Sequence, residues 1–342
     1  MKRWFLVPLL STLLLVPVHA DDLNARAASV KTQLQTQWLP AWSTKSPANE
    51  SAVDAAQLVQ TLSRAHRLGY STPQLNLVEA ARVHYKLLRD SRRDKTNEGF
   101  FAASGGNNAP TKSTLLQAQV VLALVEFARV SGDNEQRPLA IKTWRLLRDR
   151  ARDRIDGGYY DSFISAPPTP TSATASGDKS AATHLAMLEA GTALFELTRD
   201  RSIRTDLLEL LDLNAGRFFP ERPEEASAAY NNIWEPLSPI ARPAEALRTE
   251  AGTAIARAQL ALGTPVRWID FVHRTETTNP APTSEEESAR LEALTLLAPL
   301  SSSRDERASQ IDTTLDTINA TSIQPSFKNG VPLLNFAATF GQ

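Results

Sequence analysis

The 342-residue sequence predicts an all-α protein in which paired helices form a ring, an α/α barrel. Three observations support this fold. Segments with helical periodicity dominate the chain, whereas no pair of alternating runs forms a β-hairpin signature. Helices that are apolar nearly all round alternate with helices that carry one apolar stripe, as inner and outer helices would. A glycine-aromatic motif also recurs at intervals of about 60 residues, the length of a helical hairpin with a long connection.

The N-terminus has the pattern of a secretory signal peptide. A basic segment, Met1-Lys2-Arg3, precedes an apolar run over residues 4–18, and a small residue, Ala20, ends the expected cleavage site. Two prolines interrupt the apolar run, which is also short for a membrane anchor. We expect residues 1–20 to be removed and residues 21–342 to form one domain. The mature protein would then be periplasmic or secreted, without a membrane span.

Composition excludes several classes of function. The net charge is -1 with basic and acidic residues interleaved, which does not suggest a nucleic-acid surface. No cysteine is present, so no disulfide can form, and His66, His84 and His273 lack the spacing of metal ligands. The sequence has no phosphate loop, dinucleotide fingerprint or nucleophile elbow. We therefore expect neither a cofactor nor a metal.

The predicted helices follow one another along most of the chain. The segment 112–131 is apolar nearly all round, which is typical of an inner helix, whereas 135–154 has a single stripe through Trp144. The same alternation recurs in the next two segments. The full set covers about residues 23–37, 51–67, 75–90, 112–131, 135–154, 180–198, 201–216, 244–262, 284–300 and 303–318.

The recurring motif and the long connections indicate where a ligand would bind. The motif reads Glu98-Gly-Phe-Phe101, then Gly157-Gly-Tyr-Tyr160, then Gly216-Arg-Phe-Phe219, and it predicts short extended lips at the hairpin ends near Phe100, Tyr159 and Phe218. Connections rich in Pro, Ser, Thr and Gly would gather at one mouth of a barrel, where a ligand would sit. They cover residues 105–108, 167–176, 220–238 and 275–283.

Several stretches of the chain together resemble one family. They are Asn97-Glu-Gly-Phe-Phe101, Asp156-Gly-Gly-Tyr-Tyr-Asp-Ser-Phe163, Lys179-Ser-Ala-Ala-Thr-His-Leu-Ala-Met-Leu-Glu-Ala190, Ile233-Trp-Glu-Pro-Leu-Ser-Pro-Ile240 and Thr249-Glu-Ala251. They resemble segments of the N-acylglucosamine 2-epimerase and cellobiose 2-epimerase family, over about residues 50 to 300. The resemblance implies an (α/α)6 barrel whose mouth binds a sugar. Six units would need about 360 residues, so we expect one terminal hairpin, the last, to be trimmed.

The resemblance also shows where this chain departs from the family. Epimerisation moves a proton beside the carbonyl of an opened sugar and needs two bases on opposite faces, normally histidines. If Glu250 is the glutamate of the family's Gly-His-x-x-Glu motif, the histidine position holds Leu247. The family's C-terminal Pro-Tyr-His has no counterpart, because no histidine follows His273. In the Thr-His-Leu-His pattern, His184 is kept and the second histidine is Ala186.

Three further positions point the same way. Gln57 and Gln60 stand where the family's early inner helix offers an arginine and a tryptophan, and Leu115 stands where it has a tyrosine. The resemblance therefore implies a barrel that kept its scaffold and lost or replaced the family's epimerase reaction.

Nine residues are candidates for a functional site. His184 in the first turn of an inner helix, with Glu189 and Glu250 on apolar helices, are the catalytic candidates. Each has a structural alternative, a helix-start histidine for the first and arginine-paired carboxylates for the others. The candidates for sugar binding are Phe100, Gln117, Tyr159, Tyr160, Asp161 and Trp234, whose alternatives are core packing or backbone hydrogen bonding. Asp161 with a glutamate could also form a glycosidase acid-base pair.

Three functions remain open on this basis. The leading hypothesis is a secreted or periplasmic barrel that binds or processes a carbohydrate, with the two-histidine chemistry lost or replaced. The second is an active sugar 2-epimerase or isomerase, or a hydrolase or lyase, with relocated acid-base residues. The third is a non-catalytic scaffold of an envelope polysaccharide system, with envelope proteins as partners.

Overall fold

The computed structural model describes residues 20–102, 111–165, 177–220, 222–237, 240–264, 289–292, 294–295, 310–311, 314 and 327–340. The expected signal peptide lies outside these residues except for Ala20, as do His273 and three of the expected long connections, 105–108, 167–176 and 275–283. No helix in the described part of the chain is long and apolar enough to cross a membrane.

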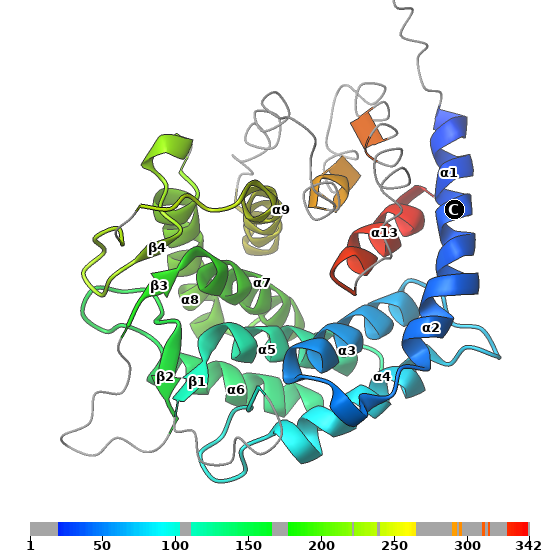
Figure 1. Cartoon of the computed structure of the whole chain (residues 1–342), viewed down its shortest axis with the longest axis horizontal. Helices are drawn as coiled ribbons and strands as arrows, with labels where there is room; N and C mark the ends of the chain where they lie inside the picture. Colours follow the sequence, from blue (N-terminus) through cyan, green and yellow to red (C-terminus); the bar gives the residue numbers. More distant parts are fainter. Residues whose placement is uncertain are drawn as a thin grey trace, which may run out of the picture.

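The described helices form the predicted ring of inner and outer helices (Figure 1). Inner helices α3 (Ala52–Arg67), α5 (Thr114–Ala128), α7 (Ala181–Thr198) and α9 (Glu245–Leu262) each contact the next. Outer helices α4 (Leu77–Leu87), α6 (Gln136–Arg150) and α8 (Arg201–Leu213) pack on α3, α5 and α7, respectively. The all-α barrel is therefore confirmed, and its hairpins follow one another in chain order.

The apolar patterns explain which helices lie inside. On α5, Leu116, Ala118 and Val121 are all buried although they lie on different sides of the helix, because neighbours pack on both sides. On α6, Leu139, Trp144 and Leu147 form one buried stripe, and the arginines of its last turn lie outside it. Each of α3, α5 and α7 begins after a serine whose side chain accepts a hydrogen bond from a first-turn N–H group, namely Ser51, Ser113 and Ser180.

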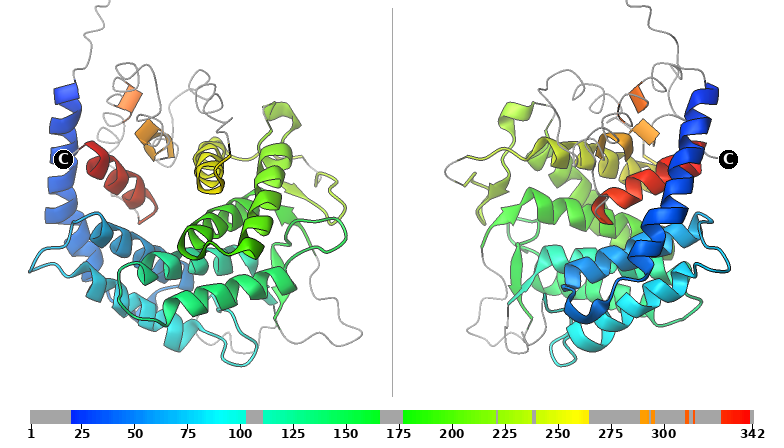
Figure 2. Two further views of the ribbon diagram at one scale, coloured as in Figure 1. Left: turned by 180° about the vertical axis from the view of Figure 1, so that it is seen from behind. Right: turned by 45° about the vertical axis from the view of Figure 1, so that its right-hand side comes forward.

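The two ends of the chain meet to close the ring. Helix α1 (Ala20–Gln33) packs against α13 (Phe327–Phe340), and α13 packs against α3. Figures 1 and 2 show this neighbourhood from different sides. The sequence pattern predicts no helix over the residues of α13, because Pro332 and Gly330 weaken its helical periodicity. Its buried residues Leu333, Leu334 and Phe336 supply the packing that offsets this weakness.

Short extended segments lie at one end of the barrel. Strand β1 (Thr111–Ser113) pairs antiparallel with β2 (Ser162–Ile164), and β3 (Lys179–Ser180) with β4 (Ala229–Tyr230). The remaining short elements are π-helical turns η1 (Leu34–Trp38), η3 (Leu88–Arg92) and η4 (Asn214–Phe218), helix α2 (Leu39–Ser43), and 3-10 turns η2 (Pro47–Asn49) and η5 (Pro223–Glu225).

Two of the three predicted lips are confirmed. The backbone of Phe100 forms an isolated antiparallel β-bridge with Arg93. Tyr159 forms the same kind of bridge with Arg152. The third expectation is wrong, because Phe218 lies in the π-helical turn η4, where the N–H group of Phe219 donates to the carbonyl of Asn214. The chain therefore continues the outer helix at this motif instead of reversing.

Candidate functional site

A cavity of about 630 Å³ lies inside the ring of inner helices. It extends from the first turns of α5, α7 and α9, at Leu115, Ala182 and Leu247, to their last turns. Its lining comprises Gln57, Gln60, Thr61, Arg64, Arg67, Leu115, Gln119, Leu122, Glu126, Arg129, Ala182, Leu185, Ala186, Glu189, Thr192, Ala193, Glu196, Leu247, Glu250, Ala254, Arg257, Leu260, Ala289, Glu292, Val331 and Pro332.

Every position at which the family resemblance indicated a changed residue on an inner helix lines this cavity. Gln57 and Gln60 come from α3, Leu115 from α5, Ala186 from α7 and Leu247 from α9. These five side chains therefore line one cavity. At their level the cavity has amides, methyl groups and leucines, and no imidazole among the described lining residues.

Charged side chains begin one helical turn further along the same helices. Arg64 follows Gln60 by four residues, and Glu189 follows Ala186 by three. Glu250 has the same relation to Leu247. One turn of an α-helix is about 5.4 Å, so the charged level lies about that far toward the C-terminal ends of the inner helices.

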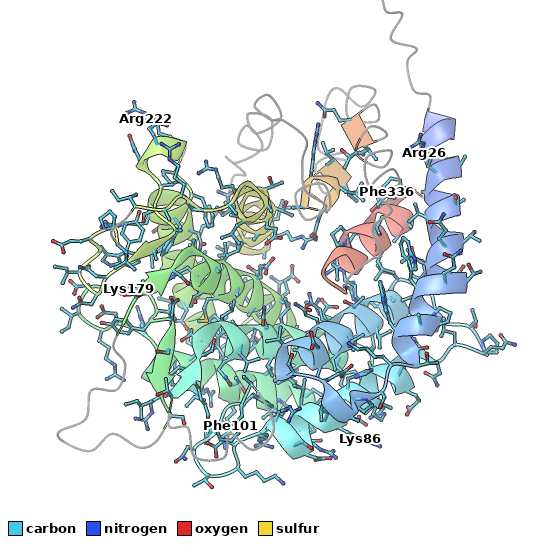
Figure 3. The ribbon with its side chains drawn as sticks, in the orientation of Figure 1. Arg26, Lys86, Phe101, Lys179, Arg222 and Phe336 are labelled. Atoms are coloured by element: carbon cyan, nitrogen blue, oxygen red, sulfur yellow. The ribbon has the colours of Figure 1, made fainter. Side chains whose placement is uncertain are left out.

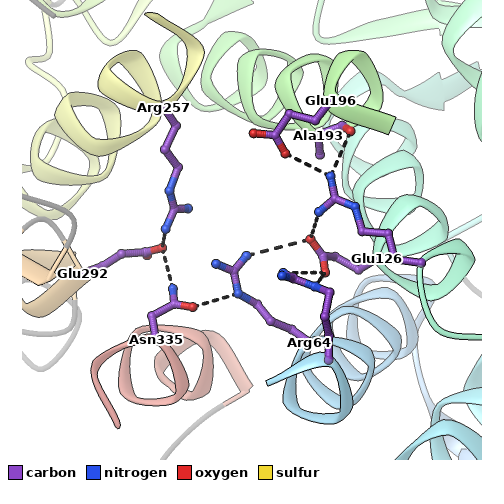
Figure 4. Close-up of polar contacts among 9 residues, drawn as sticks. Arg64, Glu126, Ala193, Glu196, Arg257, Glu292 and Asn335 are labelled. Atoms are coloured by element: carbon purple, nitrogen blue, oxygen red, sulfur yellow. Dashed lines mark hydrogen bonds and ion pairs between the residues drawn. The ribbon is translucent and has the colours of Figure 1, made fainter. Parts of the chain in front are cut away.

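Most of these charges neutralise one another in a network that crosses the cavity (Figure 4). Glu126 accepts a hydrogen bond of 2.8 Å from Arg129, and it pairs with Arg67 at 3.2 Å and Arg64 at 3.8 Å. Arg129 also donates to Glu196 at 2.9 Å. Three arginines therefore surround one buried carboxylate, and a second carboxylate balances part of the excess positive charge.

Helix α13 joins the other half of the network. The Nε group of Arg64 donates to Asn335 at 2.8 Å, and the amide of Asn335 donates to Glu292 at 3.3 Å. Arg257 donates to the same oxygen of Glu292 at 2.5 Å. Burial, together with the charge of Arg257, lowers the pKa of Arg64 to about 10, and the charge of Glu126 opposes this shift. Arg64 remains a cation at neutral pH.

Glu189 differs from its charged neighbours. It makes no hydrogen bond or ion pair with any residue that the structure describes. Burial, and then the charges of Glu250 and Glu292, raise its pKa to about 8, because Arg257 and Arg64 only partly compensate. Its carboxyl group is therefore mostly protonated at neutral pH, inside a cavity that a ligand could enter.

This raised pKa predicts a pH-dependent stability. An unfolded chain ionises a glutamate above its ordinary pKa of 4.5, whereas the folded protein keeps the proton up to about 8. The unfolded state then binds fewer protons, so Glu189 costs the fold more stability as the pH rises from 4.5 to 8. We expect Glu189→Gln to match the parent near pH 4.5 and to be more stable near pH 8, by about 1–3 kcal/mol.

Urea unfolding of both proteins across this pH range measures the effect. Glu79→Gln, which changes an exposed carboxyl on α4, is the control and should leave the pH dependence unaltered. Parallel pH curves for Glu189→Gln and the parent would contradict a raised pKa at this position.

His184 lies outside the cavity, at the base of a lip. It is 0% exposed, its Nε2 atom accepts a hydrogen bond of 3.0 Å from the Tyr159 N–H group, and its Nδ1 atom lies 2.9 Å from the Ser180 carbonyl. Burial lowers its pKa to about 4, although the Ser180 carbonyl opposes this. The ring is therefore neutral, carries its proton on Nδ1, and already uses both nitrogens.

The equivalent position in the preceding repeat of the glycine-aromatic motif explains the structural role of His184. There the Gln117 side chain accepts from the Phe100 N–H group at 2.7 Å and donates to the Ser113 carbonyl at 3.4 Å. Gln117 and Ser113 stand 67 residues before His184 and Ser180, in the same positions at the start of α5. The side chains of Gln117 and His184 therefore each hydrogen-bond a lip to the start of the helix that follows it.

Replacing His184 by the residue of the other repeat tests this interpretation. We expect His184→Gln to lower the free energy of unfolding by less than about 1 kcal/mol, because an amide can make both bonds. His184→Leu should cost about 1–3 kcal/mol, since the buried N–H group of Tyr159 loses its acceptor. Urea unfolding measures both. A His184→Gln protein as unstable as the leucine variant would contradict the assignment.

The six predicted sugar-binding residues also lie outside the cavity lining. Phe100, Gln117 and Tyr159 are at most 1% exposed within the lips. Asp161 accepts hydrogen bonds from Ser180 and Thr183 at the start of α7, and Tyr160 donates to Asp153 at 2.9 Å. Trp234 donates to the Asp156 carbonyl at 2.8 Å and covers Gly158. These residues hold the rim together.

The structure therefore brings together Glu189 and Glu250 of the nine candidates. Four charged residues of the cavity were not predicted from the sequence: Arg64, Glu126, Arg257 and Glu292. The signal that selected Glu189, a charge on an apolar inner helix, was also present at Glu126 on α5. No group of acids and histidines among the described residues is arranged to hold a metal ion.

Comparison with known proteins adds a family model and several solved structures. The model described as N-acylglucosamine 2-epimerase (GlcNAc 2-epimerase) matches residues 40–262. None of the curated proteins compared with the chain matches it in sequence.

Two similar structures are cellobiose 2-epimerases. That of Spirochaeta thermophila DSM 6192 has a TM-score of 0.74 at 20% identity, with 94% of this chain and 98% of that chain covered. That of Bacillus thermoamylovorans B4167 has a TM-score of 0.77 at 17% identity, with 92% and 99% covered.

A third structure is an inactive variant of the alpha-1,6-mannanase of Salegentibacter sp. HEL1_6 in complex with alpha-1,6-mannotetrose. Its TM-score is 0.64 at 12% identity, with 92% of this chain and 99% of that chain covered. At these identities the likeness concerns the fold, and it confirms the (α/α)6 barrel.

Proposed function

Because the chain belongs to the N-acylglucosamine 2-epimerase family, we propose that its barrel cavity binds a carbohydrate and that the family's two-histidine epimerisation does not take place there. The observation that carries this proposal is that no imidazole stands at two positions of the cavity wall where the family resemblance implies histidines. The residues at these positions, Ala186 and Leu247, line the cavity, and neither side chain can accept a proton.

The remaining lining suits a sugar. Gln57, Gln60 and Gln119 present amide groups, which both donate and accept hydrogen bonds, and the Oε1 atom of Gln119 has no partner among the described residues. A volume of about 630 Å³ is within the usual range for small-molecule sites. The sugar-bound mannanase with the same fold supports this choice of ligand class.

Export is part of the proposal. Residues 1–20 have the pattern of a signal peptide, which supports a periplasmic or secreted protein. Fractionation of cells that produce the full chain, followed by N-terminal sequencing of the mature protein, tests this. A chain that retains Met1 in the cytoplasm would contradict export.

Calorimetry with mannose, N-acetylmannosamine, cellobiose and manno-oligosaccharides tests binding. Ala186→Trp should fill the cavity and weaken any sugar binding at least tenfold, whereas Val83→Trp on the outer surface should leave it unchanged. Equal affinities of these two variants would contradict the site. A protein that binds none of these sugars would favour the scaffold hypothesis.

Proton exchange tests the loss of epimerisation. In deuterated water, two-base chemistry replaces the hydrogen at C2 by deuterium and yields the C2 epimer. We expect neither change with cellobiose or N-acetylmannosamine. A deuterated epimer formed in proportion to the protein concentration would contradict the proposal.

A further inference from the structure

A ten-residue segment with one charge pattern occurs twice in the chain, 59 residues apart. Residues 86–95 read Lys-Leu-Leu-Arg-Asp-Ser-Arg-Arg-Asp-Lys, and residues 145–154 read Arg-Leu-Leu-Arg-Asp-Arg-Ala-Arg-Asp-Arg. Each segment has five cations and two acids, whereas the whole chain has a net charge of -1. The first begins at the end of α4 and the second at the end of α6, and each leads into one of the two lips. We call them the two basic segments.

The fold accounts for only part of this repeated pattern. The second leucine of each segment, Leu88 or Leu147, is 0% exposed in the core. The second acid, Asp94 or Asp153, is also buried, and in each lip a buried lysine donates to it at 2.8 Å. The leucines and these acids therefore hold the hairpins together. Because the two carboxylates are neutralised inside the protein, they do not offset the cations that remain at the surface.

The repeated cations have no structural partner in common. The side chain of Arg93 makes no hydrogen bond or ion pair with a described residue, whereas its counterpart Arg152 pairs with Glu209. The third hairpin shows that such cations are not needed for folding. Its equivalent segment, residues 203–212, contains a single cation, Arg204. The two basic segments therefore share positive charge at the surface and not a set of contacts.

Several of these cations keep unused hydrogen-bond donors. Lys86 (Figure 3), Lys95 and Arg145 are exposed, and their side chains make no hydrogen bond or ion pair with a described residue. Exposed Arg154 makes one long hydrogen bond, of 3.4 Å, to the carbonyl of Asp149. A guanidinium carries five N–H donors and an ammonium carries three. The basic segments can therefore bind a ligand that is rich in acceptors.

The second basic segment also forms a pocket of about 550 Å³. It is lined by Arg148, Asp149, Arg152, Asp153, Arg154, Ile155 and Gly157. Its volume is within the usual range for small-molecule sites. The Asp153 carboxylate already accepts hydrogen bonds from Lys179, from Tyr160 and from two N–H groups. The free polar groups of the pocket are therefore mainly the donors of its arginines.

The two basic segments lie close enough for one extended ligand. Glu98, in the first lip, pairs with Lys142 of α6 at 2.8 Å. Arg89 pairs with Glu135, at the start of the same helix, at 3.5 Å. The first segment and its lip therefore contact the helix that leads into the second. A helix rises about 1.5 Å per residue, so about 12 Å separate Lys142 from Arg150, where α6 ends.

We propose that the two basic segments form a surface site for an acidic polysaccharide, whose carboxylate groups they bind. Arginine and carboxylate groups form paired, charge-assisted hydrogen bonds. A polymer with a carboxylate on successive sugars can occupy both segments at once, so that two weak contacts act together. The concave pocket fits a sugar unit, whereas a flat membrane surface would not fill it. None of the described residues of this pocket lines the barrel cavity, so the two sites are separate.

Calorimetry with polygalacturonate tests the inference, and its methyl ester, which lacks the charges, is the matched control ligand. We expect the protein to bind the acid and not the ester, and to bind more weakly at high ionic strength because the cations are exposed. Arg93→Ala with Lys95→Ala should weaken binding by about 3–10-fold. Arg145→Ala with Arg154→Ala should have a similar effect, because these side chains also contribute charge and few internal contacts.

Two controls locate the site. Lys31→Ala with Arg222→Ala removes two cations outside the basic segments and should leave the Kd unchanged. Ala186→Trp, which fills the barrel cavity, should also leave it unchanged. A loss of affinity in either control equal to that of the segment variants would overturn the site, as would absence of binding to polygalacturonate. Tighter binding to phosphatidylglycerol vesicles than to the polymer would assign the basic segments to a membrane surface and overturn the proposed partner.

Discussion

Lys179→Met is expected to lower the free energy of unfolding by about 3–5 kcal/mol, because it leaves a buried carboxylate without its counter-ion. Lys179 is 0% exposed beside the rim (Figure 3), and its Nζ group donates to Asp153 at 2.8 Å and to the Asn232 carbonyl at 2.7 Å. The same group lies 4.4 Å from the centroid of the Trp234 ring. One side chain therefore ties the lip to the connection after α8.

The pH dependence of this loss has a definite sign. Burial alone would raise the pKa of Asp153, but hydrogen bonds from Lys179, from the N–H groups of Ile155 and Asp156, and from Tyr160 hold it down to about 2. The stabilisation is present above the ordinary pKa of 3.8 and is lost as the pH falls through 2. The difference between Lys179→Met and the parent should therefore shrink in acid.

Urea unfolding at pH 7 and pH 3 measures both effects. The double variant Lys179→Met with Asp153→Asn should lose less stability than the single one, because no charge is left unpaired. Arg222→Ala, which breaks the exposed pair with Glu225, is the control and should cost less than about 1 kcal/mol. A Lys179→Met variant no less stable than this control would rule out the structural role of the pair.

Gly158→Ala is expected to cost about 3–4 kcal/mol, since two separate penalties add. Gly158 has a φ of +76°, a conformation that L-residues adopt at a cost of about 1–2 kcal/mol. An added Cβ atom would also lie 2.7 Å from the Trp234 ring and 2.9 Å from Nε2 of His184. The indole would have to leave the rim, and the bond between His184 and Tyr159 would be strained.

Gly69→Ala isolates the first penalty, the strain of a side chain at positive φ. Gly69 has a φ of +83°, and an added Cβ atom would meet nothing within 4 Å. We expect this control to lose only about 1–2 kcal/mol. Thermal or urea unfolding of the two variants gives the comparison, and equal losses would show that the Trp234 ring moves aside without cost.

The two lips show how much of the backbone structure the local sequence predicts. The Asp94 N–H group donates to the Gly99 carbonyl, and the Asp153 N–H group donates to that of Gly158 in the same pattern 59 residues later. Both glycines have positive φ. A glycine between polar and aromatic residues indicates such a reversal without any knowledge of distant contacts. The motif ending at Phe219 looked alike and continues a helix, because its backbone bonds back to Asn214.

The residues of the candidate site could be predicted only in part from the sequence, for a related reason. Side chains on one inner helix share a face by periodicity, so the positions of Ala186 and Leu247 in the cavity followed from the family resemblance. Whether a polar residue faces the cavity or the rim depends on the rotation of each helix and on which lip it fastens. His184 and Glu189 stand five residues apart on α7, yet only the glutamate reaches the cavity.

By itself the sequence determined the ring of paired helices and the two lips at Phe100 and Tyr159, because periodicity and turn residues are local properties. Only the tertiary structure decided that α1 and α13 pack together beside α3, that Asn335 joins Arg64 to Glu292 across the ring, and that Glu189 bonds none of the described residues. Contacts between residues hundreds of positions apart depend on how helices pack, and no local pattern records that packing.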